Sequence, residues 1–170
     1  MTAWRLSYRA DEAALPLADR HYNRQAIGSP QFVPPGRCVC LLTADRSALW
    51  VTSWPRAEYV QHTWAGAWIN SLFRNEGTGR ASDLILEAIA ITRAIWTPPA
   101  AGLVTFVDPA AVLGVRRRGG TIYGYCYLKA GFEHVGFTTE RNLWAWQLWP
   151  ARMPDPDFSV TRPLFAEAQS

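Results

Sequence analysis

The strongest constraint on the fold is one amphipathic helix that stands between two apolar strands. Residues 82–96 (SDLILEAIAITRAIW) carry apolar side chains at helical spacing, and Pro98 and Pro99 stop the helix. Residues 67–74 (AWINSLFR) precede it as an expected strand. Residues 103–108 (LVTFVD) follow it as the kind of short apolar strand that lies in the centre of a sheet. The helix and both strands therefore belong to one layered α/β core.

The rest of the chain adds strands and two short helices, and the order of elements predicts a mixed α/β domain with one central sheet. We expect residues 1–150 to form this domain and residues 151–170, which are rich in proline, to form a poorly packed tail. The further strands are expected at residues 2–8, 38–44, 48–54, 134–138 and 143–149, and the helices at residues 10–20, interrupted or ended near Pro16, and 123–132, ended near Gly131.

Composition favours a globular protein and is compatible with a nucleic-acid or nucleotide partner. Of the 170 residues, 49% are apolar and 18% charged, which excludes a disordered chain, and most of the nine tryptophans are expected in the core. The net charge is +3, and Lys129 is the only lysine, so arginine supplies nearly all of the positive charge. Arginine suits phosphate recognition, because its planar guanidinium group can donate two hydrogen bonds. A genome rich in G and C would also favour arginine codons over lysine codons. The run from Arg116 to Arg118 lies in an expected glycine-flanked loop and is either a DNA-phosphate contact or a solvated loop.

Cysteine usage and hydropathy indicate a cytoplasmic protein, or one in the cytoplasm of a bacterial host if a phage encodes it. Cys38, Cys40 and Cys126 form no CxxC pair and no metal-ligand spacing, so we expect reduced thiols. Cys38 and Cys40 should point the same way from their strand. No signal peptide opens the chain, and no apolar run approaches the roughly 20 residues that span a bilayer, so no membrane partner is expected.

A glycine-containing loop joins the strand at residues 67–74 to the long helix. Its sequence, RNEGTGRAS, allows several backbone N–H groups to face one point beside the positive helix end, with Ser82 as the expected N-cap. Such a loop can cradle a pyrophosphate, and a plain glycine turn is the alternative. The residues expected to hold cofactor phosphates are Arg74, Asn75, Gly77, Gly79 and Ser82.

A second motif, Tyr127-x-Lys129-x-Gly131-Phe132, follows about 50 residues later. Together the two motifs resemble the GNAT acyltransferase superfamily, whose cofactor loop reads Q/R-x-x-G-x-G/A and whose chain ends with a Y-x-K-x-G-F segment. The resemblance implies a GNAT-like single domain with a mixed, twisted sheet flanked by helices, and acetyl-CoA or a related acyl-CoA as cofactor. It also implies that Tyr127 is the general acid toward the departing thiolate. An amphipathic helix closed by a glycine C-cap is the alternative.

A more specific resemblance spans roughly residues 19–138 and is to the Mom family of phage DNA-modifying enzymes. The matching pieces are His21-Tyr22, SLFRNEG, SDLILEA, Asp108 in TFVD, and GYCYLKAGF. The resemblance implies transfer of an acyl-derived group to the exocyclic amine of adenine in double-stranded DNA, which protects that DNA from restriction. It also implies that His21, Tyr22 and Asp108 are functional, so we expect the three to meet in one cleft.

His21 or Asp108 would act as the base or would bind a divalent metal such as iron, although two ligands are too few to define a metal site. The target base must leave the stack, and Tyr22, Phe32 or Trp54 would hold it. The alternatives are a surface His-Tyr pair and a turn aspartate before proline. At the level of function, the alternatives are an ordinary N-acetyltransferase acting on a small amine or a protein, and a DNA-binding module without catalysis.

Overall fold

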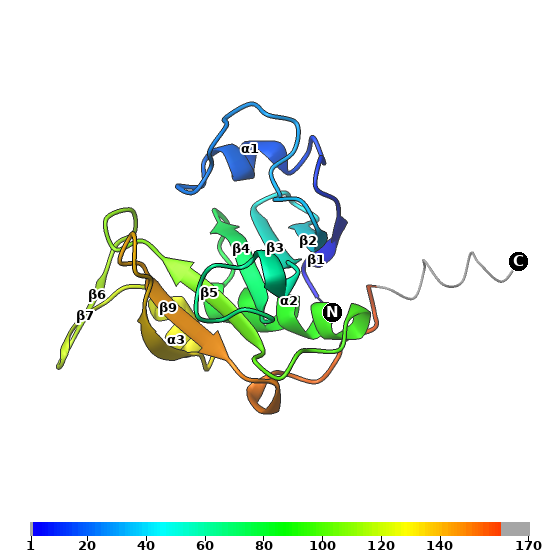
Figure 1. Cartoon of the computed structure of the whole chain (residues 1–170). Helices are drawn as coiled ribbons and strands as arrows, with labels where there is room; N and C mark the ends of the chain where they lie inside the picture. Colours follow the sequence, from blue (N-terminus) through cyan, green and yellow to red (C-terminus); the bar gives the residue numbers. More distant parts are fainter. Residues whose placement is uncertain (1, 161–170) are drawn as a thin grey trace, which may run out of the picture.

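A mixed sheet runs through the protein, and residues 2–160 are the part of the chain that the computed structural model describes (Figure 1). Within these residues the sheet has seven strands in the order β1-β2-β3-β4-β5-β9-β8. Every neighbouring pair is antiparallel except β4 and β5, which are parallel and are joined by the long helix α2. The strands are β1 Trp4–Ser7, β2 Arg37–Thr43, β3 Ala48–Trp54, β4 Trp68–Asn75, β5 Leu103–Val107, β8 Glu133–Phe137 and β9 Trp144–Leu148.

Helices cover both faces of the sheet, and a small hairpin projects from the body (Figure 1). The helices are α1 Leu15–Asp19, α2 Ala81–Ile95 and α3 Tyr125–Lys129, with 3-10 turns at Ala57–Tyr59 and Pro150–Arg152; the hairpin pairs β6 Val115–Arg117 with β7 Gly120–Ile122. The mixed α/β class with one central sheet is therefore confirmed. None of the helices within residues 2–160 is long and apolar enough to cross a membrane.

Strand alternation divides the buried side chains into two clusters. Leu41 and Trp50 face α2 and α3, whereas their neighbours Leu42 and Leu49 face α1. All four are fully buried, because side chains at successive strand positions point to opposite faces and both faces are covered. Seven of the nine tryptophans belong to the cluster that faces α2 and α3, which confirms that most of them serve the core: Trp4, Trp50, Trp54, Trp68, Trp96, Trp144 and Trp146.

The sequence predicts most elements correctly and errs at their ends. Arg80, not Ser82, is the N-cap of α2, and no side chain within residues 2–160 caps that end. Ser82 lies in the first turn, so its prediction as N-cap is wrong. Pro16 is in the first turn of α1 and opens this helix, because the first turn needs no N–H from proline. The Arg116–Arg118 run lies in the β6–β7 hairpin and its turn, not in a plain loop.

The segment after Pro150 packs against the body of the protein, so the expectation of a poorly packed tail is wrong for it. Met153 is buried in the α2 cluster. Arg93 Nη1 donates to the carbonyl oxygen of Pro154 at 2.6 Å, and the Asp157 amide donates to Ala90 O at 2.9 Å. Both bonds join the segment to α2. Residues 161–170 lie outside the described residues.

Candidate active site

β4 and β5 diverge toward their carboxyl ends. Their parallel pairing stops at Asn70 and Thr105, although both strands continue beyond these residues. On the other side of β4, the register with β3 skips Ser71, which forms a β-bulge. A bulge bends its strand, and here it turns the end of β4 away from β5. The divergence opens the sheet at the carboxyl ends of its parallel strands, where ligands bind in open α/β sheets.

The Asn70 side chain stabilises the bulge. Its amide nitrogen donates to the carbonyl oxygens of Val51 and Leu72 at 3.0 and 2.9 Å. Its amide oxygen accepts from the hydroxyl of Tyr127 at 2.8 Å and from that of Thr105 at 3.1 Å. Asn70 is 5% exposed, so these four bonds form where water cannot replace them. One buried amide therefore links β3, β4, β5 and α3.

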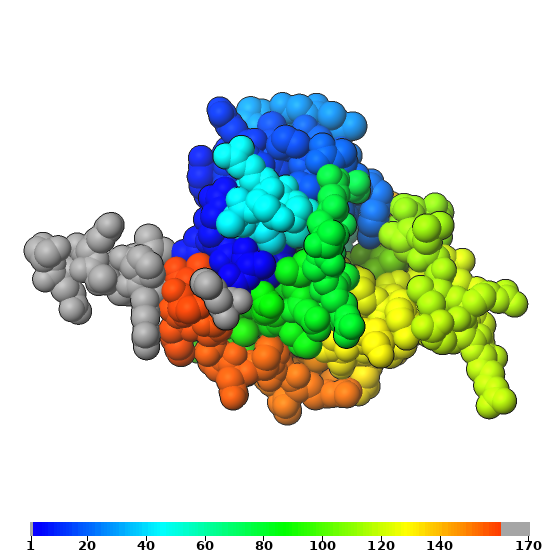
Figure 2. Space-filling model, turned by 180° about the vertical axis from the view of Figure 1, so that it is seen from behind, coloured from blue at the N-terminus to red at the C-terminus, as the bar shows by residue number. Residues whose placement is uncertain are grey.

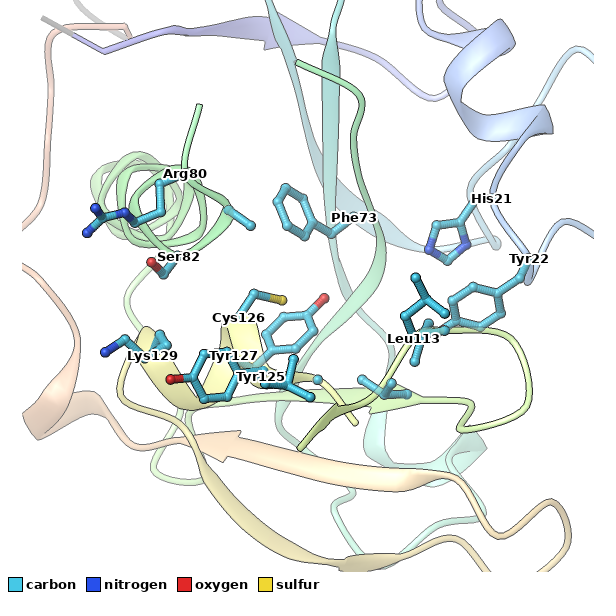
Figure 3. A pocket seen from close by; sticks show the side chains of 15 residues that line it. His21, Tyr22, Phe73, Arg80, Ser82, Leu113, Tyr125, Cys126, Tyr127 and Lys129 are labelled. Atoms are coloured by element: carbon cyan, nitrogen blue, oxygen red, sulfur yellow. The ribbon is translucent and has the colours of Figure 1, made fainter. Parts of the chain in front are cut away.

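A cavity of about 700 Å³ lies at the diverging ends. His21 and Tyr22 stand on one side of it, and Arg80, Ser82 and Lys129 on the other, with Cys126 and Tyr127 between them (Figure 3). The remaining lining residues are Phe73, Ala81, Val107, Val112, Leu113, Val115, Gly124 and Tyr125. The cavity therefore combines the loop after α1, the helices α2 and α3, and the ends of both parallel strands.

His21 and Tyr22 enter the cavity from the loop that follows α1. Their rings stack with centroids 4.4 Å apart, and the Tyr22 hydroxyl donates to Phe106 O at 3.2 Å. Asn23 Nδ2 donates to Ser71 O at 2.6 Å, which turns the Asn23 Oδ1 atom toward His21 Nδ1, 2.5 Å away. The Asn23 backbone amide donates to the same Nδ1 atom at 3.3 Å, so Asn23 contacts this nitrogen through both its side chain and its backbone. Burial lowers the pKa of His21 despite the opposing Asn23 bond, and burial raises the pKa of Tyr22.

Asp108 lies beside this pair but is not one of the residues that line the cavity. Its carboxylate accepts a hydrogen bond from the backbone amide of Ala110 at 2.9 Å. This bond closes the turn that begins with Asp108 and Pro109. Its other oxygen is 3.5 Å from Arg141 Nη2. Asp108 acts on the pKa of Tyr22 in two opposite ways: a hydrogen bond with its backbone lowers that pKa, and the negative charge of its carboxylate raises it. The sequence-level alternative of a turn aspartate thus describes its contacts, and Tyr22 is its link to the cavity.

The expected metal site does not fit these contacts. Both carboxylate oxygens of Asp108 have protein partners, and Nδ1 of His21 faces Asn23. Within residues 2–160, no group of three or more histidine, cysteine, aspartate or glutamate side chains could hold a metal ion.

Arg74, expected at the cofactor phosphates, bonds to the α1 side of the sheet. Its Nη1 donates to Arg20 O at 2.8 Å, and its Nε pairs with Glu76, which also binds the Arg20 side chain at 2.8 Å. The two guanidinium groups lower the pKa of Glu76 to about 2. Arg74 is not a lining residue, because its neighbour Phe73 takes the cavity face of β4. Its contacts join the end of α1 to the end of β4.

The glycine loop is ordered by its own asparagine. Asn75 Oδ1 accepts from the amide of Gly77 at 3.0 Å, and its Nδ2 donates to Gly79 O at 2.8 Å. Asn75, Gly77 and Gly79 are not lining residues, whereas Ser82 is. A Cβ at Gly77 would lie 2.5 Å from Ser47 Oγ, so close packing against the β2–β3 turn explains this glycine. The loop thus aims the start of α2 at the cavity.

Sequence reasoning missed the cationic residues at the cavity edge. Arg80 is the N-cap of α2, is largely exposed and pairs only at 4.0 Å with Asp83. Lys129 lies at the last position of α3 and is also exposed. The sequence did contain a signal for Arg80, because it is the second arginine of the RNEGTGRAS segment and stands where the glycine loop meets the helix. The uncapped first turn of α2 adds partial positive charge at the same place.

The interior of the cavity, in contrast, is uncharged at neutral pH. Burial lowers the pKa of His21, raises that of the Cys126 thiol to about 11, and raises that of the Tyr127 phenol well above its usual value. The positive charges of Arg80 and Lys129 lie at the edge. The cavity therefore suits a ligand with an apolar, neutral end inside and an anionic group outside.

A groove of about 360 Å³ lies on the opposite face of β5 and is aromatic. The ring of Phe106 packs on His62 and Trp64, with centroids 5.1 and 5.6 Å apart. Arg141 lines the groove, and the backbone oxygen of Phe106 accepts from the Tyr22 hydroxyl. Tyr22 therefore touches the cavity on one side and the groove-forming residue Phe106 on the other.

Two aromatic residues expected to hold a base lie elsewhere. Phe32 is 8% exposed in the cluster beneath α1. Trp54 packs on Trp68 and Trp96 at the opposite end of β3 from the cavity. Tyr22 alone of the three expected residues lines the cavity. The expectation is therefore wrong for Phe32 and Trp54.

The β6–β7 hairpin stands out beside the cavity (Figure 2). Val115, at its base, is a lining residue. Arg116, Arg117 and Arg118 are exposed, and the Arg117 guanidinium lies 4.5 Å from the ring centre of Tyr125. The hairpin thus carries three positive charges out from the cavity edge.

Comparisons with protein-family models, curated proteins and solved structures gave no match.

Proposed function

We propose that this protein is a GNAT-like acyltransferase that modifies the exocyclic amine of adenine in double-stranded DNA. One observation carries the acyltransferase part: a neutral, partly apolar cavity opens between diverging parallel strands and has a cationic edge at a helix N-terminus. An acyl-CoA has the matching chemistry, with an uncharged acyl thioester at one end and phosphates at the other. The single parallel strand pair supports the GNAT-like fold expected from the two motifs.

Bound acyl-CoA would supply an acyl group activated for attack by an amine. Arg80, Lys129 and the first turn of α2 would bind its phosphates. The His21 imidazole would accept the proton of the attacking amine, because burial lowers its pKa and favours the neutral ring. Tyr127 would return a proton to the departing sulfur, since burial keeps the phenol protonated. In its resting position the Tyr127 proton is held by Asn70.

The choice of adenine in DNA follows from the resemblance to the Mom family, and three features support it. Exposed arginines on the β6–β7 hairpin suit a phosphate backbone. The groove of His62, Trp64 and Phe106 offers aromatic surface for a base outside the stack. Tyr22 lines the cavity and donates to the backbone oxygen of the groove residue Phe106, so this tyrosine is a direct contact between the two sites.

The decisive experiment is to digest genomic DNA from expressing cells to nucleosides and to measure their masses. We expect a new, heavier deoxyadenosine with the wild-type protein and none with His21→Ala. Unmodified DNA together with acetylation of a small amine by the purified protein would favour an ordinary N-acetyltransferase. DNA binding without either product would favour a module without catalysis.

Calorimetry with acetyl-CoA tests whether the cationic edge of the cavity binds the cofactor phosphates. Arg80→Glu should weaken binding, because it places a negative charge where the phosphates would lie. Arg56→Glu is the matched control, since the Arg56 side chain is 79% exposed and that of Arg80 77%, and each pairs loosely with one acidic residue. Equal weakening by both changes, or by neither, would contradict the assignment of this edge to the phosphates.

A further inference from the structure

The two cysteines of β2 bring their sulfur atoms together outside the candidate active site. Cys38 and Cys40 occupy alternate positions of the strand, so both side chains project from one face, and their sulfurs are 3.9 Å apart. Cys40 is 2% exposed within the cluster beneath α1, and Cys38 is half-buried at its margin. The third cysteine, Cys126, lines the cavity instead.

A guanidinium group stands beside this sulfur pair. Arg9 Nη2 donates to Cys38 Sγ at 3.3 Å and to the carbonyl oxygen of Gly36, while its Nη1 reaches Pro34 O at 3.5 Å. The backbone contacts hold the arginine in place against the sulfur. The Cys40 thiol donates to the same sulfur at 3.9 Å, so Cys38 Sγ accepts hydrogen bonds from both a thiol and a guanidinium group.

The spacing is better suited to chelation than to a disulfide. Two strand residues separated by one are about 6.4–6.8 Å apart at Cα, the upper limit of disulfide geometry. A bridging ion bonded in line to both sulfurs needs about 4.6 Å, taking roughly 2.3 Å for each metal–sulfur bond. A small rotation of the half-buried Cys38 side chain would lengthen the distance between the two sulfurs from 3.9 Å to the distance that the ion needs. The strand backbone can stay as it is.

The donor set and the charges select the kind of ion. No third histidine, cysteine, aspartate or glutamate joins the pair among residues 2–160, so a four-coordinate zinc site has too few ligands. Paired thiolates select soft ions such as Cu(I). Two thiolates and Cu(I) leave one negative charge, which the adjacent Arg9 guanidinium balances. Both sulfurs bind as thiolates, so any thiol proton that they carry is released to solvent on binding.

We propose that Cys38 and Cys40 form a chelating dithiol site for a soft, two-coordinate cation of the Cu(I) type, with Arg9 balancing its charge. The site lies on the α1 face of β2 and is independent of the proposed acyl transfer. Its occupant is recognised by two sulfur ligands alone.

The test is an anaerobic Cu(I) titration of the reduced full chain against a chromophoric Cu(I) chelator. The expected result is one tightly held ion per chain. Cys38→Ser and Cys40→Ala should each weaken binding by more than about 100-fold, because even partners outside the ligand set carry roughly 10–100-fold. Arg9→Gln should cost roughly 10-fold, as it removes the charge and leaves both sulfurs. Cys126→Ser is the matched control and should bind as the wild type does.

A failure to compete with the chelator, or wild-type affinity in Cys38→Ser, would overturn the proposal. Circular dichroism shows whether the buried Cys40→Ala variant is folded, and Cys38→Ser decides the matter if it is not. X-ray absorption at the copper edge provides the second measurement: two sulfur neighbours are expected, and three or more would overturn two-coordination.

Discussion

The Tyr127→Phe substitution shows whether the Tyr127 hydroxyl takes part in catalysis or only stabilises the fold. The hydroxyl donates to Asn70 Oδ1 at 2.8 Å, and the ring is 7% exposed. Its removal does not orphan the Asn70 oxygen, because the Thr105 hydroxyl also donates to it at 3.1 Å. The loss is then one net hydrogen bond, or about 1 kcal/mol of unfolding free energy. For a chain of this length this corresponds to a fall in Tm of about 2–4 °C.

Activity should fall far more than stability. A positioned general acid contributes roughly 10²–10⁴-fold to the rate, so kcat of Tyr127→Phe should drop by that factor. Thr105→Val is the control, because it removes the other donor to the same amide oxygen and leaves the phenol in place. It should cost a similar amount of stability and keep most of the activity.

Urea unfolding followed by tryptophan fluorescence gives the stabilities. The amount of modified deoxyadenosine formed over time, measured by mass spectrometry, gives the rates. Equal activity losses in Tyr127→Phe and Thr105→Val would show that Tyr127 acts only through the fold. A stability loss above about 3 kcal/mol in Tyr127→Phe would refute the assumption that Thr105 keeps Asn70 satisfied.

Four further predictions concern the fold, the base and the DNA contact. Asn70→Ala should cost about 4 kcal/mol in urea unfolding, since four buried hydrogen bonds lose their partner, and a loss near 1 kcal/mol would mean that the bulge holds without them. Because burial lowers the pKa of His21 below 6.5, the acid limb of kcat/KM should have its midpoint below pH 6.5; a midpoint above it would exclude His21 as the base. Replacing Arg116–Arg118 by alanine should reduce the slope of log K against log salt for duplex DNA by up to about 2.7, and an unchanged slope would remove the hairpin from the interface. Gly102→Ala should destabilise the protein by roughly 2–3 kcal/mol in the same unfolding assay, because φ is +68° and the new Cβ would lie 2.1 Å from the carbonyl oxygen of Leu148; wild-type stability would show that β9 yields easily.

The sequence by itself determined the elements and the chemistry available to them. The apolar periodicity of residues 82–96 and the two prolines after it located α2, because helix formation depends on neighbours within a few positions. Alternation of apolar residues placed Cys38 and Cys40 on one face of β2. The motifs singled out His21, Tyr22, Ser82 and Tyr127, all of which line the cavity.

Only the tertiary structure decided how these pieces meet. The bulge at Ser71 depends on the register between β3 and β4, and the bond of Asn70 to Tyr127 joins residues 57 positions apart. Arg74 was expected at the cofactor, but its position on β4 turns it toward α1, and Arg80 takes the cavity edge instead. Such contacts are set by which strands pair and which face is buried, and these depend on residues that are far apart in the sequence.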